Sequence, residues 1–258
     1  MIGLAREAGY LGARGVRALL RQPWYVAVTL VQPVIWLLLF SQLFRQVTRL
    51  PGFPGNSYIA FLTPGVVVMT CLFSSGWAGM GLIVDMDRGV MNRFLVSPVR
   101  RGALITGALL YQALSIVVQS LIILGLGAAC GARFPGGAVV LVVFLVGVLL
   151  LGAAFASYSN ALALLIRREE SVIGAVNFLV LPLSFLSATL LPVNLLPDWM
   201  RQVARFNPVN WAVLVGRETL SPDVDWGLVA SRTGCLAALA IAAGWLSTRA
   251  FRAYQRSV

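Results

Sequence analysis

The chain has 258 residues, of which 59% are hydrophobic and 11% are charged, and its mean hydropathy is +0.86. Soluble domains carry roughly 25% charged residues, so this composition excludes an ordinary soluble protein and predicts one all-α bundle in a membrane. The net charge of +11 comes from arginine, because the chain contains no lysine and no histidine. A Walker A loop, a Ser-His-Asp site and a histidine-ligated metal site are therefore impossible.

The first 22 residues predict a basic amphipathic helix that lies in the inner membrane interface. On a wheel of 100° per residue, four arginines fall within a sector of about 80°, and apolar residues lie elsewhere. These arginines are Arg6, Arg14, Arg17 and Arg21. Four glycines in the same stretch weaken helix formation, so a basic tail that only sets orientation remains the alternative.

Six apolar stretches are long enough to cross the hydrocarbon, which takes about 20 residues. They are residues 25–44, 58–84, 104–129, 138–166, 172–191 and 227–247. With the N-terminus inside, the inner segments hold thirteen arginines and the outer segments seven. Arginine excess marks the cytoplasmic side, so both termini are predicted to be cytoplasmic. The arginines flank apolar segments and contact lipid headgroups, which argues against nucleic-acid binding.

Residues 85–102 connect the second and third spans on the inner side. Met91, Phe94 and Leu95 have i, i+3, i+4 spacing, and Ser97-Pro98 ends the short helix that this spacing predicts. A short amphipathic helix at this place suits docking into a groove of a soluble partner. A solvated connector whose apolar face rests on the headgroups is an equally good interpretation.

Residues 192–226 form the outer segment between the fifth and sixth spans, and they predict two short amphipathic helices. Trp199 and Phe206 share a helical face with Val203. Asn207-Pro208 then supplies an N-cap and an N1 proline for a second helix that passes through Trp211. The two helices are candidates for a gate over an outer exit, and a lid without substrate contact is the alternative.

The carboxylates all lie between the apolar blocks, and none lies well inside one. They are Glu7, Asp85, Asp87, Glu169, Glu170, Asp198, Glu218, Asp223 and Asp225. Carriers driven by protons or sodium usually need an ionisable group near mid-membrane, so the energy for any transport is expected to come from a partner.

Polar residues inside the spans are the candidates for a substrate path. The predicted path residues are Gln32, Ser74, Asn177 and Ser184. Further polar positions in the spans are Gln112, Gln119 and residues 157–160. For any one of them, hydrogen bonding between helices is the commoner role. Uncharged, apolar walls favour an amphipathic or lipid-like substrate over an ion.

These features, in this order, resemble the ABC-2 family of ABC transporter permeases, and most closely the daunorubicin-resistance type. The first motif comprises Asp85, Asp87, Gly89, Arg93, Leu95, Ser97, Pro98, Val99 and Arg101. The second comprises Pro192, Leu196, Pro197, Trp199, Asn207, Pro208 and Val209, followed by Arg217. The resemblance covers nearly the whole chain, 1–258, as a single transmembrane domain.

The resemblance implies an export permease in a bacterial plasma membrane, with a drug, lipid or glycolipid as substrate. Two permease copies, identical or related, pair with two copies of a separate ATPase that holds ATP and magnesium. This chain then binds no cofactor and is not an enzyme. The path follows the dimer interface, the outer short helices form the gate, and the N-terminal helix joins the ATPase contact.

The resemblance also places a coupling helix at about residues 87–96, docked on the ATPase. The implied coupling residues are Asp85, Asp87, Arg88, Met91, Arg93, Phe94, Leu95, Ser97 and Pro98. Family members commonly carry glutamate at the position of Asp87 and an acid within the stretch 90–92. The coupling surface is therefore less acidic here than in the family pattern.

Two other functions compete with an export permease. A self-sufficient secondary carrier lacks its mid-membrane carboxylate, and a membrane-embedded lipid-modifying enzyme lacks a full catalytic constellation. Asp85 and Asp87 are the tempting pair for an enzyme, but they lie beside the docking segment, which favours coupling.

Overall fold

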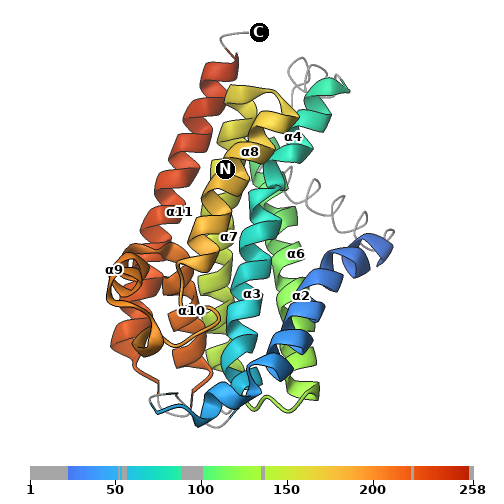
Figure 1. Cartoon of the computed structure of the whole chain (residues 1–258). Helices are drawn as coiled ribbons and strands as arrows, with labels where there is room; N and C mark the ends of the chain where they lie inside the picture. The colour runs from blue at the N-terminus through green and yellow to red at the C-terminus, as the bar shows by residue number, and fades with distance from the viewer. Residues whose placement is uncertain are drawn as a thin grey trace.

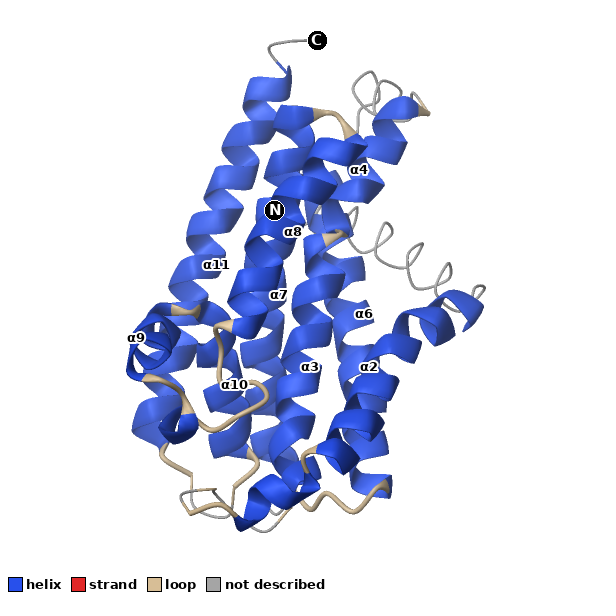
Figure 2. Cartoon of the chain, viewed as in Figure 1, coloured by secondary structure: helices blue, strands red, loops and turns tan. Residues whose placement is uncertain are grey.

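The computed structural model describes residues 23–51, 53, 57–88, 101–134, 137–221 and 224–255. Within these ranges the chain is helical and has no strand, which confirms the all-α prediction (Figure 2). The helices are α2 (Pro23–Leu43), α3 (Tyr58–Gly76), α4 (Ala78–Asp87), α6 (Arg101–Ala129), α7 (Gly137–Ile166), α8 (Glu169–Phe185), α9 (Asp198–Phe206), α10 (Pro208–Thr219) and α11 (Trp226–Gln255). Two short 3-10 helices span Arg45–Arg49 and Val193–Leu195. The predicted interfacial helix, 1–22, lies outside the described residues.

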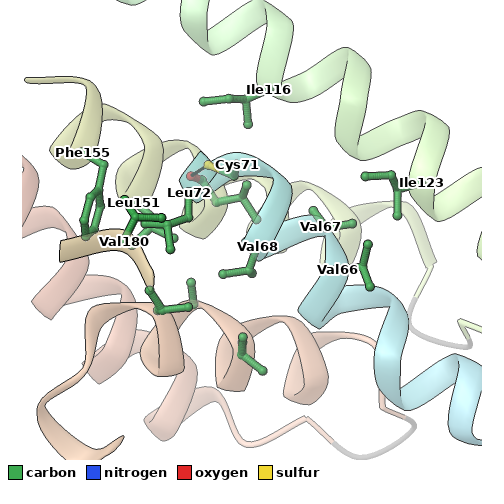
Figure 3. Packing of buried hydrophobic residues seen from close by; sticks show 14 of the residues in the cluster. Val66, Val67, Val68, Cys71, Leu72, Ile116, Ile123, Leu151, Phe155 and Val180 are labelled. Carbon is green, nitrogen blue, oxygen red and sulfur yellow. Dashed lines mark hydrogen bonds between the residues drawn. The ribbon is translucent and has the colours of Figure 1, made fainter. Parts of the chain in front are cut away.

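Helix α7 is the central element of the bundle and contacts α3, α4, α6, α8, α10 and α11. Its apolar face buries Phe144, Val148 and Leu151 completely, in one cluster with Val67 and Leu72 of α3. Figure 3 shows Leu151 in this cluster with residues of α3. α11 runs along one side, whereas α2 packs on α3 at one end and diverges from the bundle toward its own N-terminus (Figure 1). We call the end that holds Asp87, Ile166 and Glu169 the upper end, as it lies in Figure 1.

Among the described residues, four helical stretches are long and apolar enough to cross a membrane. They are Tyr58–Asp87, Leu109–Ala129, Val139–Ile166 and Trp226–Arg252. They match the second, third, fourth and sixth predicted spans, and a shorter apolar stretch, Val28–Leu43, matches the first. The count of six spans therefore stays a prediction.

The helix α8 ends at Phe185, six residues before the far boundary of the fifth predicted span, 172–191. Pro182 lies in the last turn of α8 and cannot donate a backbone hydrogen bond to the preceding turn. Leu186 leaves the helical conformation, and the chain turns toward α9. The sequence stays hydrophobic past the end of α8 because the turn that follows is buried: Ala188 and Thr189 are at most 1% exposed.

The second predicted span, 58–84, is one apolar stretch in sequence but two helices in the structure. α3 and α4 meet at Trp77, and Ser159 of α7 bridges the break. Its hydroxyl donates to the Gly76 carbonyl oxygen and accepts a hydrogen bond of 3.0 Å from the Gly79 backbone N–H. A Cβ atom at Gly79 would lie 2.4 Å from the Ser159 carbonyl oxygen, so the helices approach this closely only because residue 79 is glycine.

Replacing Ser159 with alanine is expected to destabilise the bundle by about 2 kcal/mol, because it leaves a buried N–H and a buried C=O without a partner. Thermal unfolding of the purified chain in lipid nanodiscs measures this effect. Ser184→Ala is the matched control, since the Ser184 hydroxyl is equally buried but bonds to Val180 within its own helix. Equal stability of the two variants would contradict the bridging role of Ser159.

Candidate substrate cavity and outer segment

A cavity of about 740 Å³ lies between α2, α3, α4 and α6 and reaches α7 and α8. It runs from the upper end of the bundle into its interior, because its lining includes both Asp85 near the end of α4 and Val66 in the middle of α3. Its walls are mostly apolar and aromatic. They include Val28, Pro33, Trp36, Met69, Phe73, Trp77, Met80, Leu109, Tyr111, Val118 and Ile173.

Polar side chains line this cavity at several depths. The Gln112 amide nitrogen Nε2 donates to the Ser74 hydroxyl at 3.0 Å, which joins α6 to α3. Gln119 and Asn160 are 7% and 3% exposed, and Gln119 Oε1 and Asn160 Oδ1 have no hydrogen-bond partner. Two acids, Asp85 and Glu169, line the cavity at the upper end.

The predicted path residues divide into two pairs. Gln32 of α2 and Ser74 of α3 both line the cavity. Asn177 and Ser184 of α8 are not among its described lining residues, and the Ser184 hydroxyl donates to the Val180 carbonyl oxygen at 2.7 Å. The structure thus brings Gln32 and Ser74 together, whereas the bond of Ser184 stays within its own helix.

The coupling residues are described in part. Asp85 is half-buried in α4, and Asp87 and Arg88 are exposed where α4 ends. The other predicted coupling residues lie outside the described residues: Met91, Arg93, Phe94, Leu95, Ser97 and Pro98. The same holds for the arginines of the predicted interfacial helix, Arg6, Arg14, Arg17 and Arg21. Their roles stay predictions.

The outer segment folds into the two short helices that the sequence predicts, α9 and α10. Asn207 caps α10, since its Oδ1 accepts the backbone N–H of Val209 at 2.9 Å, and Pro208 takes the N1 position. The Asn207 amide nitrogen Nδ2 donates to the carbonyl oxygens of Leu183 and Leu186, 2.7 and 2.9 Å away. Asn207 therefore also satisfies the end of α8, which the sequence does not predict.

The aromatic residues chosen for the gate take two different positions. Trp199 and Phe206 on α9 are 59% and 80% exposed, so they form an apolar face without a partner in the described chain. Trp211 of α10 is half-buried, and its ring nitrogen Nε1 donates to the Arg205 carbonyl oxygen at 2.6 Å. The shared face of α9 is confirmed, and its role as a gate remains a prediction.

Arg217 of α10 has a structural role that the sequence does not predict. Its Nη2 donates to the carbonyl oxygens of Ala188 and Thr189 in the turn after α8, and its Nε donates to the Phe61 carbonyl oxygen at 3.4 Å. The guanidinium carbon also lies 3.6 Å from the centre of the Phe61 ring. Arg217 thus ties α10, α3 and the turn together.

A second residue that the sequence reasoning passed over, Asn210, adds to this network. Its Oδ1 accepts the Ala188 backbone N–H at 3.1 Å, and its Nδ2 donates to the Ala204 carbonyl oxygen at 2.9 Å. The turn after α8 and the last turn of α9 are therefore both bonded to Asn210 in the first turn of α10. The extended outer segment is one hydrogen-bonded unit rather than a loose loop.

The cavity also takes in Gln112 and Gln119, two of the further polar positions of the sequence analysis, and Ser115, which the sequence analysis did not name. Their i, i+3, i+7 spacing places them on one face of α6, and all three line the cavity. A polar stripe along an otherwise apolar span indicates a buried interface or a cavity.

Comparison with known proteins identifies the family of the chain. The family model described as ABC-2 type transporter matches residues 6–220. A transport permease of Cyanophora paradoxa is 30% identical over 75% of this chain and 67% of its own length. A daunorubicin resistance ABC transporter permease of Streptomyces coeruleorubidus is 27% identical over 84% and 76%, and nodulation protein J of Rhizobium meliloti is 29% identical over 86% and 84%. The chain belongs to the ABC-2 type transporter family and is a membrane permease of that family.

Proposed function

We propose that the chain is the transmembrane subunit of an ATP-driven exporter that moves a hydrophobic or amphipathic substrate out of a bacterial cell. The observation that carries this proposal is the cavity of about 740 Å³, whose walls are mostly apolar and whose lining includes Asp85, the first residue of the predicted coupling loop. Relatives named for daunorubicin or doxorubicin resistance support a substrate of this kind. The cell membrane is the proposed location, with both termini cytoplasmic.

The energy comes from a separate ATPase that docks at the upper end of the bundle. The chain has no lysine, so it has no Walker A loop of its own, and ATP and magnesium are held by the partner. Asp87 and Arg88 are exposed where α4 ends and residues 89–100 begin. This position suits the docking helix at about 87–96, and two ATPase copies serve two permease copies.

A second permease copy covers part of the apolar surface that the single chain leaves exposed. On α8, Phe178 and Phe185 are 83% and 55% exposed, and Phe206 on α9 is 80% exposed. Lipid tails satisfy such side chains as well as protein does, so exposure alone does not choose between them. The family pattern supports a dimer along this surface, formed by two identical or two related permeases.

The test of this function is co-purification. When the tagged chain is extracted from its native membrane in a mild detergent, we expect a Walker-containing ATPase to accompany it. The complex in vesicles should hydrolyse ATP and accumulate substrate, whereas the chain alone should move nothing uphill. Substrate accumulation by the isolated chain under a proton or sodium gradient would contradict the proposal.

A further inference from the structure

We propose that a second cavity, at the predicted outer end of the bundle, binds the phosphate group of an anionic phospholipid. This cavity has a volume of about 840 Å³ and lies where α2 ends and α3 begins, at the opposite end from Asp87 (Figure 1). The described lining residues of the two cavities do not overlap, so the lipid site is separate from the candidate substrate cavity. A single copy of the chain supplies the lining.

The charged residues among the described lining of this second cavity are both arginines. Arg45 and Arg49 belong to the 3-10 helix that follows α2, and both are exposed. Among the described residues, the salt bridge joins Arg201 to Asp198, and neither Arg45 nor Arg49 has a carboxylate partner. Two guanidinium groups that line a cavity without a carboxylate select an anionic ligand.

Neutral donors and the first turn of α3 complete the polar wall. Gln42 and Gln46 line the cavity with amide groups, and Tyr58 and Ile59 line it at the start of α3. The first backbone N–H groups of a helix have no partner within the helix and carry the positive end of its dipole. A phosphate group offers more acceptor oxygens than a carboxylate, and the planar fork of a guanidinium matches it. The donor set therefore favours phosphate.

The opposite wall is the end of α6, which lines the cavity with Cys130 and Gly131. The carbonyl groups at the C-terminus of a helix repel an anion when they lack donors. Here the carbonyl oxygens of residues 126–128 accept hydrogen bonds from the backbone N–H groups of residues 130–132. The end of α6 is therefore capped by its own turn, which weakens its repulsion of a phosphate.

The apolar surface beside the cavity favours a lipid over a free anion. Leu38 lines the cavity, and it shares one face of α2 with Ile35 and Val31, at i, i+4, i+7 spacing. The three side chains are 46–54% exposed. Arg45 directly follows the predicted span 25–44, which places it at the depth of the headgroups. One phospholipid can therefore contact the arginines with its phosphate and α2 with an acyl chain.

Two fluorescent lipids with the same acyl chains test this proposal. Phosphatidylglycerol and phosphatidylcholine, each with a nitrobenzoxadiazole group on one acyl chain, differ in the headgroup alone. We expect saturable binding of the phosphatidylglycerol probe to the purified full chain in dodecylmaltoside micelles, measured by fluorescence anisotropy against empty micelles. The phosphatidylcholine probe is expected to bind about tenfold more weakly, because its ammonium cancels the net negative charge that the arginines attract.

Two variants and a matched control locate the site. Arg45→Gln and Arg49→Gln are each expected to weaken binding of the phosphatidylglycerol probe about threefold, and about tenfold when combined. Both arginines are exposed, so thermal unfolding of the double variant should be unchanged. Arg205→Gln is the control, because Arg205 is an exposed arginine of α9 that is not among the described lining residues. Its binding of the probe should equal that of the unchanged chain.

Inorganic phosphate distinguishes a lipid headgroup from a free anion. In large excess, it should displace no more probe than sodium chloride of the same ionic strength, because it has no acyl chain to pack on α2. Displacement beyond that would mean that a free anion takes the cavity, and would overturn the assignment to a lipid.

Equal binding of the two lipid probes, a double variant that binds as well as Arg205→Gln, or absence of saturable binding would each contradict the proposal. The assay needs neither an ATPase nor a transported substrate. The lipid site can therefore fail while the export function stands, and the reverse also holds.

Discussion

Replacing Arg217 with methionine is expected to lower the free energy of unfolding by about 3 kcal/mol and to abolish transport. The guanidinium donates to the carbonyl oxygens of Phe61, Ala188 and Thr189, and the last two lie in a turn that is almost completely buried. Methionine fills much of the space but donates nothing, and each buried carbonyl left without a donor costs about 1–3 kcal/mol. Among the described residues, a salt bridge joins Arg201 and Asp198, and none involves Arg217. Replacing Arg217 therefore leaves no partner carboxylate with an unpaired charge.

Thermal unfolding in nanodiscs and substrate uptake by reconstituted vesicles measure the two effects. Arg205→Met is the control, because Arg205 is an exposed arginine of the same outer segment. Arg217→Lys should recover only part of the stability, since one ammonium cannot reproduce the planar fork that reaches two elements. If Arg217→Met unfolds and transports as the Arg205→Met control does, Arg217 does not hold the outer segment together.

The two outer helices were predictable because their signals are local. Asn207-Pro208 is a cap and an N1 proline within two adjacent residues, and the apolar face of α9 repeats at helical spacing. Both features act within one or two turns of helix, so the sequence around them decides the structure. The long apolar stretches are local signals too, and they therefore predict the long helices of the bundle.

The break at Trp77 and the end of α8 depend on contacts between distant residues, and the apolar pattern of the sequence does not predict where either occurs. Ser159 satisfies the freed backbone at Trp77 from 80 residues away, and Arg217 satisfies the turn after α8 from 28 or 29 residues away. A hydropathy profile does not detect such donors, because a buried turn and a buried helix have the same apolar composition. Arg217 therefore enters the sequence analysis as a charge for topology and as the residue that follows the second motif, but not as a donor to this turn.

The cavity shows a similar division. Its polar stripe on α6 is visible as spacing, but its acids come from α4 and α8, which are far apart in the chain. Asp85 was assigned to coupling because of the motif around it, and the structure shows that it also lines the cavity. Asp85 therefore belongs both to the lining of the cavity and to the predicted coupling loop.

The largest effect is expected from Phe94→Asp, which should reduce ATPase activity in the reconstituted complex to that of the ATPase alone and stop transport. The spacing of Met91, Phe94 and Leu95 predicts an apolar face centred on Phe94, and a carboxylate there cannot be desolvated in a hydrophobic groove. Insertion into the membrane should be unchanged, because the substitution lies outside the apolar stretches. Membrane yield, ATPase rate and uptake measure these three outcomes separately.

Asn92→Asp is the matched control for Phe94→Asp. It introduces the same carboxylate two residues away, outside the apolar face, in the stretch 90–92 where family members commonly carry an acid. We expect it to preserve ATPase stimulation, since it makes the surface more similar to the family pattern. Loss of activity in both variants would mean that negative charge in this segment is not tolerated at all. Full transport by Phe94→Asp would contradict coupling through this face, and the ATPase would then have to act through another part of the upper end.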